Sequence, residues 1–252
     1  MDVTPKGWRI AGGVSAVLVA VGAFTAVQAS ATEPAKTSGK AVAAAVPEFR
    51  DDFTSFDKNV WSCEYTCPTI EGEKARFRLK SAVAPDNYGS WSKARYKARK
   101  FTEGKFTVRF ALTDRPEKKV DDKKGVWWGV ALWDDGPKAD GSQFNEINFG
   151  YTTNQSFTNT QLLFESAKRG KYKSVKVDTG VNLYDQQWHE ATLEYDRNAV
   201  KFYLDGKLLE TITDQAVIPT DPMSLILGPR LVTGSQPLTQ GFTESIDWVT
   251  IN

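Results

Sequence analysis

Residues 104–112 read GKFTVRFAL, a run whose pattern indicates the fold class. From Lys105 to Leu112, large apolar side chains alternate with side chains that are mostly polar. Successive side chains of a strand point to opposite faces of its sheet, so this alternation is typical of a strand that is buried on one side. One face would carry Phe106, Val108, Phe110 and Leu112, and the other would carry Lys105, Thr107, Arg109 and Ala111.

The same two-residue period recurs along the chain. Residues 191–195 and 200–204 alternate in this way, and Asp205-Gly206 then separates two apolar runs. Asp-Gly between apolar runs is a strong signal for a β-hairpin. One more such run, residues 242–251, closes the sequence. Many short alternating runs predict an all-β domain of two antiparallel sheets packed face to face, with one outer face free to curve into a groove.

The N-terminal segment, residues 1–31, has the pattern of a secretory signal peptide. Lys6 and Arg9 precede an apolar run over residues 10–27, and Ala29-Ser30-Ala31 then supplies a small-x-small cleavage site. A membrane anchor is the alternative, because the apolar run is nearly long enough to span a bilayer. Small residues dominate the run and the cleavage site follows it directly, so we expect cleavage after the tripeptide.

The remaining sequence divides into a lead-in and one domain. Residues 32–47 lack periodicity and large apolar groups and are expected to be flexible, whereas residues 48–252 suit a single domain. Cleavage lowers the formal net charge of +1 by one unit, so the chain lacks the basic footprint of a nucleic-acid-binding protein. We therefore expect a secreted monomer, extracellular or in the cell wall, with neither a nucleic acid nor a membrane as partner.

The only two cysteines, Cys63 and Cys67, lie four residues apart in the segment CEYTC. Outside the cell such a pair is expected to form a disulfide. Loop-closure entropy for so short a ring corresponds to about 2 kcal/mol, so the bond would be a local clip. A metal site would need more ligands nearby than this segment offers.

Seven segments of the chain, taken in order, carry a resemblance to a known family. They are DDF at 51–53 followed by Trp61, GKFTVRFAL at 104–112, GVWWGVALW at 125–133, NEINFGY at 145–151, WHEATLEYD at 188–196, VKFYLDGKLL at 200–209 and SIDWVTI at 245–251. This order resembles glycoside hydrolase family 16, the laminarinase and lichenase group. The resemblance implies a concanavalin A-like β-jelly-roll sandwich with a concave cleft, and endo-acting, retaining hydrolysis of β-linked polysaccharides.

The strand that would carry catalysis departs from the family's pattern, which reads Glu-x-Asp-x-Glu, or Glu-x-Asp-x-x-Glu where the strand is bulged. Retaining hydrolysis needs a carboxylate nucleophile and an acid/base carboxyl about 5–5.5 Å apart. Glu146 matches the nucleophile, but Asn148 replaces the aspartate, and the acid/base position holds Gly150, or Tyr151 if the strand is bulged. Asn148 also removes like-charge repulsion, so we expect Glu146 to ionise in the ordinary way.

The run GVWWGVALW offers candidate sugar-binding aromatics. Its alternation places Trp127, Gly129, Ala131 and Trp133 on one face, and the better core set, Val126, Trp128, Val130 and Leu132, on the other. Trp127 and Trp133 are therefore candidates for stacking on pyranose rings, although ordinary core tryptophans are the alternative. Asn148 and Arg109 are further candidate binding residues, and a solvated surface charge is the alternative for Arg109.

A substitute acid would have to come from another part of the groove. Asp134 and Asp135 follow Trp133 at the end of a strand, and Glu165 lies in the segment LLFES. Each of these three carboxyls has an ordinary surface position as its alternative. His189, the only histidine, is interpreted as a structural residue.

The resemblance also implies that a structural calcium is possible away from the cleft. Asp247, in the segment SIDWV, matches a position that can supply a ligand. Calcium prefers six to eight oxygen ligands, and the sequence indicates no others. No cofactor is expected to be required.

Three functions follow from these residues. The first is a glycan-binding protein that keeps the groove and its aromatic residues but has lost the general acid. The second is an active retaining glycosidase with Glu146 as nucleophile and a relocated acid. The third is a structural cell-surface sandwich. Because general acid–base assistance contributes about 10²–10⁴-fold, the first predicts weak or no hydrolysis of laminarin and lichenan.

Overall fold

The computed structural model describes residues 47–252 apart from residues 121, 123, 139 and 153–156. The predicted signal peptide, residues 1–31, lies outside the described residues, as does the lead-in apart from Pro47. Strands, turns and bends make up the described part, which contains no α-helix. No helix in that part is therefore long and apolar enough to cross a membrane.

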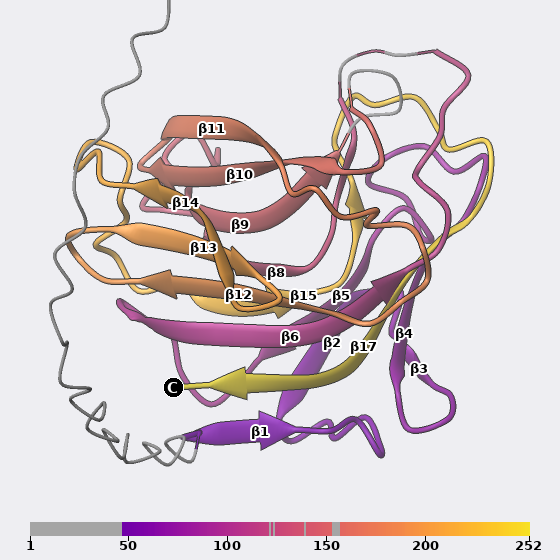
Figure 1. The fold of residues 1–252 in the computed structure, drawn as a ribbon, viewed down its shortest axis with the longest axis horizontal. Coiled ribbons are helices and arrows are strands. Elements are labelled where there is room, and N and C mark those ends of the chain that lie inside the picture. Colours follow the sequence, from indigo (N-terminus) through magenta and orange to yellow (C-terminus); the bar gives the residue numbers. More distant parts are fainter. Residues whose placement is uncertain (1–46, 121, 123, 139, 153–156) are drawn as a thin grey trace, which may run out of the picture. The chain divides into compact units, whose positions relative to one another are not determined.

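The first of two sheets has eight strands. They are β1 (Phe49–Asp51), β3 (Thr69–Ile70), β4 (Ala75–Leu79), β6 (Gly104–Leu112), β12 (His189–Tyr195), β13 (Val200–Leu204), β14 (Lys207–Ile212) and β17 (Phe242–Ile251). Their order is β14-β13-β12-β6-β17-β4-β3, with β1 paired to β17. The C-terminal strand β17 thus lies beside β6, far from it in sequence (Figure 1).

The second sheet has nine strands. They are β2 (Trp61–Tyr65), β5 (Ser92–Tyr96), β7 (Val126–Trp127), β8 (Val130–Asp134), β9 (Asn145–Thr152), β10 (Gln161–Lys168), β11 (Lys171–Asp178), β15 (Ser224–Leu227) and β16 (Arg230–Leu231). Their order is β11-β10-β9-β8-β15-β5-β2, with β7 paired to both β9 and β16. Both sheets are antiparallel, which confirms the predicted two-sheet β-jelly-roll sandwich.

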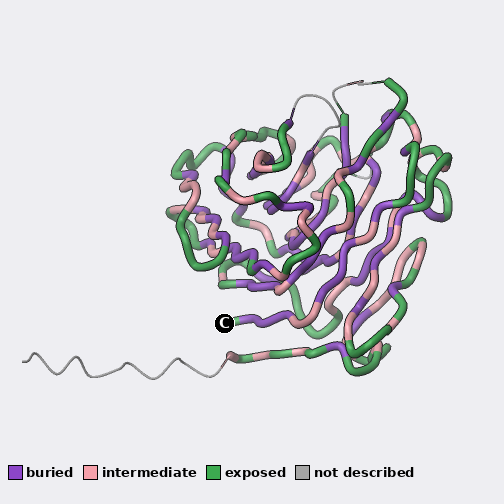
Figure 2. The backbone as a smooth tube through the Cα atoms, turned by 45° about the vertical axis from the view of Figure 1, so that its right-hand side comes forward, coloured by how far each residue is buried: buried purple, intermediate pink, exposed green. Residues whose placement is uncertain are grey.

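The core lies between the two sheets and is rich in aromatic rings. Phe202 of β13 stacks on Phe164 of β10, with ring centroids 4.4 Å apart, so the contact joins the two sheets. Phe110 of β6 makes a tilted ring contact with Trp128, which lies between β7 and β8, with centroids 5.4 Å apart. Buried and more exposed residues alternate along the strands (Figure 2). The core faces predicted for residues 104–112 and 125–133 are confirmed, because every side chain assigned to them is buried.

The predicted hairpin is formed by β13 and β14. Asp205 and Gly206 both have positive φ angles, 50° and 77°, which a tight two-residue hairpin turn requires. The Asp205 carboxylate also lies 2.9 Å from Nδ1 of buried His189, whose Nε2 is 3.3 Å from Asp185. His189 therefore holds the hairpin against β12, in keeping with a structural role.

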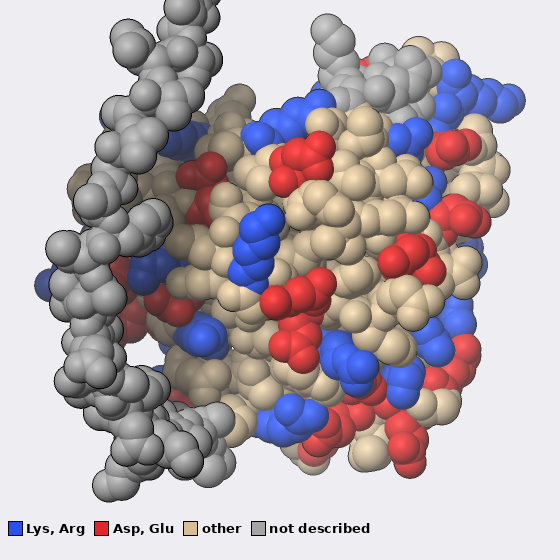
Figure 3. Space-filling model, viewed as in Figure 1, with Lys and Arg blue, Asp and Glu red and all other residues tan. Residues whose placement is uncertain are grey.

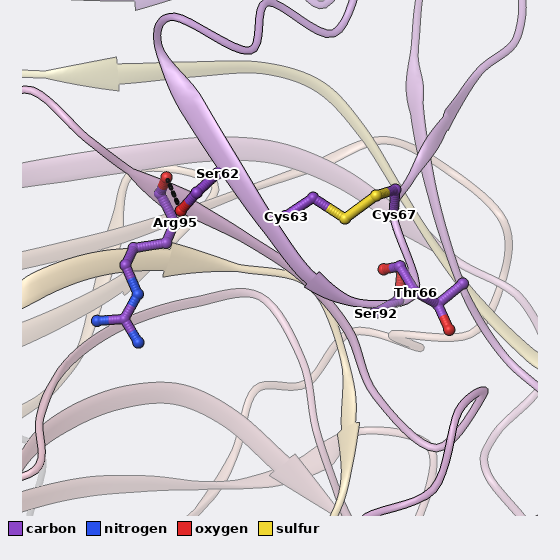
Figure 4. Close-up of a disulfide and its surroundings, with 6 residues drawn as sticks. All are labelled: Ser62, Cys63, Thr66, Cys67, Ser92 and Arg95. Carbon is purple, nitrogen blue, oxygen red and sulfur yellow. Dashed lines mark hydrogen bonds between the residues drawn. A yellow bond between two sulfur atoms is a disulfide. The ribbon is translucent and has the colours of Figure 1, made fainter.

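The disulfide between Cys63 and Cys67 is present, with the two Cα atoms 5.3 Å apart (Figure 4). It joins β2 to the segment that follows that strand. A hydrogen bond from Ser92 to the Thr66 carbonyl, at 3.0 Å, also holds this segment. The loop therefore has a second attachment that does not depend on the disulfide.

Loss of the disulfide is expected to cost little stability. Cys63→Ser together with Cys67→Ser should lower the free energy of unfolding by about 2 kcal/mol, the loop-closure value for so small a ring. Chemical denaturation of the variant, and of the reduced wild-type protein, measures the loss. Collapse of the cooperative transition in either sample would contradict the local role.

Candidate functional site

A cleft lies on the outer face of the nine-stranded sheet, where the strand register brings polar side chains together. Asn148 of β9 pairs with Ala131 of β8 on one side and with Glu165 of β10 on the other. Glu146 of β9 pairs in the next row with Trp133 and with Ala167. We call the cleft the hollow lined by Trp127, Trp133, Glu146, Asn148, Glu165 and Arg230.

Strand β9 contains a β-bulge. Phe149 pairs with Phe164, and the next pair is Tyr151 with Leu163, so Gly150 is an extra residue without a partner on β10. The bulge shifts the alternation by one residue. Tyr151 therefore faces the cleft, on the same side as Glu146. Of the two alignments that the sequence allows, the structure has the bulged one, and it turns the Tyr151 phenol toward the cleft.

Gly150 has no room for a side chain. Its φ is +96°, a conformation that residues other than glycine rarely adopt. A Cβ atom added there would lie 2.7 Å from the Trp128 carbonyl oxygen and 2.8 Å from the Trp128 ring. The backbone amide of Trp128 also donates to the Gly150 carbonyl at 3.0 Å. A carboxylic acid at position 150 would therefore disrupt the join between β7 and β9.

Glu146 lies at the bottom of the cleft, with a side chain that is almost wholly buried. The residue is 3% exposed, and its Oε1 has no hydrogen-bond partner among the described residues. Burial raises the pKa of Glu146 well above its usual range, the carboxyl of Glu165 raises it further, and Arg230 opposes both effects. The expectation that Glu146 ionises in the ordinary way is wrong, because removal of a neighbouring charge at Asn148 is outweighed by loss of water.

Among the three proposed substitute acids, only Glu165 lines the cleft. Its Oε1 accepts a hydrogen bond from the Ser174 hydroxyl at 2.6 Å, and burial raises the pKa of its carboxyl. Asp134 instead forms an ion pair with Lys100 at 2.7 Å. Asp135 accepts a hydrogen bond from Trp133 Nε1 at 2.8 Å. The structure thus places Glu165 beside Glu146 and leaves the other two at the end of β8.

The two tryptophans proposed for sugar stacking both line the cleft and are half-buried. Their ring centroids are 6.2 Å apart. Trp133 also stacks on Phe144, with centroids 5.3 Å apart and an angle of 9° between the rings. This contact holds the Trp133 ring in one orientation, as a platform for a flat ligand requires.

Arg230 and Trp91 were not identified from the sequence as cleft residues. The Arg230 guanidinium carbon lies 4.2 Å from the ring centroid of Trp91 and 5.4 Å from that of Trp127. Its Nη2 donates to Asp86 at 3.3 Å. Strand β16 has only two residues, so no alternating run signals it, and Trp91 lies just before β5. The pairing of β16 with β7, and an antiparallel bridge between Arg230 and Trp91, bring Arg230 to the cleft.

Arg109 does not contribute to the cleft, and the prediction that it could is wrong. It lies on β6, whose polar face is the outer face of the eight-stranded sheet, on the opposite side of the sandwich. Its Nη1 donates there to Asp247 at 2.6 Å, and its guanidinium lies 5.5 Å from the Trp188 ring centroid. Acidic and basic side chains are interspersed on the face of the domain that Figure 3 shows.

The surroundings of Asp247 do not fit the calcium ion that the resemblance implies. Its Oδ2 is bound by Arg109, and its Oδ1 lies 3.2 Å from Lys74 Nζ, so each oxygen faces a cation. Calcium needs six to eight oxygen ligands, and the described part of the chain holds no cluster of three acidic, histidine or cysteine side chains suited to a metal. The two basic residues supply the counter-charge for Asp247 instead.

Comparisons with known proteins agree with this architecture. The model of the family described as Glycosyl hydrolases family 16 matches residues 68–250. The Bacillus licheniformis β-glucanase is similar at 18% identity and a TM-score of 0.61, over 81% of this chain and 97% of that chain. An endo-1,3-β-glucanase (laminarinase) catalytic domain from Thermotoga petrophila RKU-1 is similar at 15% identity and a TM-score of 0.59, over 82% and 96%.

Porphyranase B from Zobellia galactanivorans is similar at 12% identity and a TM-score of 0.56, over 80% of this chain and 89% of that chain. At such identities the solved structures show a common fold alone. The search of curated proteins found no match.

Proposed function

Because this chain belongs to glycosyl hydrolase family 16, we propose that it is a secreted protein that binds a β-linked polysaccharide in the cleft. We propose further that it hydrolyses unsubstituted β-glucans weakly or not at all. The disulfide supports a place outside the cell, in an oxidising compartment.

The observation that carries this proposal is the bulge in β9. Retaining hydrolysis pairs a nucleophile with a carboxylic acid that protonates the leaving sugar. Tyr151 holds the acid/base position, and Gly150 cannot be replaced by an acid without a clash. Glu146 is the one carboxyl of the family's motif that remains. It is buried and its pKa is raised, so it stays protonated over a wider pH range than a nucleophile should. A protonated carboxyl instead donates a hydrogen bond, which suits the binding of sugar oxygens.

Hydrolysis by a relocated acid is the second candidate, and the position of Glu165 favours it. Glu165 pairs with Asn148, and Glu146 pairs with Ala167, so the two carboxyls are diagonal neighbours on one face. Burial raises the pKa of Glu165, as a general acid needs at neutral pH. In this case Glu165→Gln should abolish turnover, whereas Glu103→Gln, the same change at an exposed position outside the cleft, should leave it unchanged.

One experiment separates the two candidates. The purified domain is incubated with laminarin, lichenan, agarose, κ-carrageenan and alginate, and both binding and released reducing ends are measured. We expect at least one polysaccharide to bind, with no release of reducing ends above that of the Glu146→Gln variant. Fast release from laminarin would show that the missing-acid argument is wrong.

Trp133→Ala is expected to weaken polysaccharide binding by roughly tenfold or more, because loss of a stacking aromatic removes a large apolar contact. Trp188→Ala, on the other side of the sandwich, is the matched control and should bind as the unmodified protein does. Affinity electrophoresis and melting curves on both variants separate lost binding from lost stability. Destabilisation by about 3–5 kcal/mol would instead assign Trp133 to the core.

A further inference from the structure

We propose that the cleft is selective for polysaccharides whose sugars carry an anionic oxygen group, a carboxylate or a sulfate ester, and that this group binds beside Arg230. The inference rests on the proposed function and narrows its substrate class. Its basis is an excess of unpartnered hydrogen-bond donors and of positive charge at one end of the cleft.

Besides Nε1 of the core residue Trp128, three donors line the same pocket without a hydrogen-bond partner among the described residues. They are Asn148 Nδ2, Trp127 Nε1 and Arg230 Nε, from strands β9, β7 and β16. Asn148 is only 1% exposed, so its amide has little access to bulk water. A buried donor left unpaired costs about 1–3 kcal/mol, so a site with three of them favours a ligand rich in acceptor atoms.

The only acidic side chain that lines this pocket is Glu146. Ionised, it would repel an anionic ligand and attract the three donors. Burial and the neighbouring Glu165 raise its pKa, which favours the protonated form, itself a donor. The second acidic residue of the cleft, Glu165, lies one strand further from Arg230, and burial raises its pKa as well. The surroundings of both carboxyls therefore oppose negative charge at this end of the cleft.

Positive charge gathers around Trp91 at the same end of the cleft. Lys93 Nζ lies 4.3 Å from the Trp91 ring centroid, and the Arg230 guanidinium lies 4.2 Å from it. Arg95 lies two residues after Lys93 on β5, and both bind the carboxylate of Glu64. The Arg95 Nε is 3.0 Å from Glu64 Oε1, and the Lys93 Nζ is 2.7 Å from Glu64 Oε2. With Asp86 beside Arg230, three cations face two carboxylates. Burial, together with neighbouring Arg95 and Arg230, lowers the pKa of Lys93, so this cluster carries at most one positive charge beyond its carboxylates.

The geometry suits an anion better than a neutral hydroxyl group. A sugar hydroxyl both donates and accepts, so it is best met by a mixture of donors and acceptors. A carboxylate or sulfate only accepts, and a guanidinium donates to it in a planar fork. Stacking on Trp91 and the hydrogen bonds from Nη2 to Asp86 and Thr233 hold the Arg230 guanidinium in place before any ligand arrives, and its Nε has no partner among the described residues.

The test measures binding of the unmodified domain to laminarin and laminarin sulfate, which share one backbone, together with agarose, κ-carrageenan and alginate. We expect the affinity for the tightest-binding anionic polysaccharide to exceed the affinity for the tightest-binding neutral one by roughly tenfold or more. This difference in affinity should shrink as salt is added. Comparison of the sulfated polymers with alginate separates sulfate from carboxylate recognition.

Two variants locate the anion. Arg230→Gln should lower affinity for the preferred anionic polysaccharide by roughly tenfold, and Trp127→Phe, which keeps the ring but removes its donor, by a smaller factor. Arg78→Gln is the matched control, because Arg78 also forms one carboxylate ion pair, with Glu71, but lies in the other sheet. Melting curves check that each variant is folded.

Each outcome distinguishes the inference from the proposed function. A neutral polysaccharide that binds the unmodified domain as tightly as the anionic ones overturns the anion site and leaves the proposed function standing. Equal losses from Arg230→Gln and Arg78→Gln also overturn it, because attraction would then come from general surface charge. Failure of every polysaccharide to bind overturns both.

Discussion

Asn148→Asp combined with Tyr151→Glu is expected to give the protein hydrolytic activity. Reducing ends should be released at least ~100-fold faster than by the unmodified domain, since general acid assistance contributes about 10²–10⁴-fold. The bulge at Gly150 places Tyr151 on the same face as Glu146 and Asn148, so the two changes rebuild the bulged form of the family's motif. The substrate should be whichever polysaccharide the unmodified protein binds most tightly.

The controls for this prediction lie in the same strand. Asn148→Asp with Tyr151→Gln has a side chain of the same length without an acid, and it should stay inactive. Asn148→Asp with Gly150→Glu should fold poorly, because a side chain at position 150 meets the Trp128 carbonyl and ring. If the Tyr151→Glu pair is folded, binds its ligand and remains as slow as the Tyr151→Gln pair, the bulged alignment is wrong.

Glu146→Gln and Glu244→Gln are each expected to raise the melting temperature at pH 7 and to leave it nearly unchanged at pH 4. Glu244 of β17 is completely buried, and its Oε1 accepts the backbone amide of Gly129 at 2.8 Å. Its Oε2 has no hydrogen-bond partner in the described part of the chain. Burial raises the pKa of both carboxyls well above the usual range.

The direction of the change in melting temperature follows from proton binding in the folded and unfolded states. A carboxyl with a raised pKa in the folded protein holds its proton at pH values where the unfolded chain has released it. Its contribution to stability is therefore complete below the unfolded pKa, about 4.3, and is lost as the pH rises through the folded pKa. Glutamine has the same shape and does not titrate, so it removes this loss.

Melting curves between pH 4 and pH 8 measure the effect, in which each kcal/mol corresponds to about 2–4 °C for a domain of this size. The exposed Glu103→Gln is the control and should follow the unmodified protein at every pH. A Glu244→Gln variant that melts lower than the unmodified protein at pH 7 would show that ionised Glu244 stabilises the fold.

The sequence pattern identifies some residues of the cleft and misses others. Trp127 and Trp133 were assigned to the right face because they alternate with a buried set, Val126, Trp128, Val130 and Leu132. The sequence leaves Gly150 and Tyr151 as alternatives for one motif position, because a bulge cannot be recognised from side-chain alternation until the partner strand is known. Arg230 could not be found at all, since two residues are too few for a period.

What the sequence by itself determined is local. Side chains alternate about a strand whatever lies beside it, so the core face of residues 104–112, the hairpin at Asp205-Gly206 and the short disulfide loop could all be read from neighbouring residues. The tertiary structure alone decided which sheet each strand joins. Hydrogen bonding between distant strands placed Arg109 on the far side of the sandwich and Arg230 in the cleft. It also made Gly150 a bulge, because only pairing with β10 shows which residue of β9 has no partner.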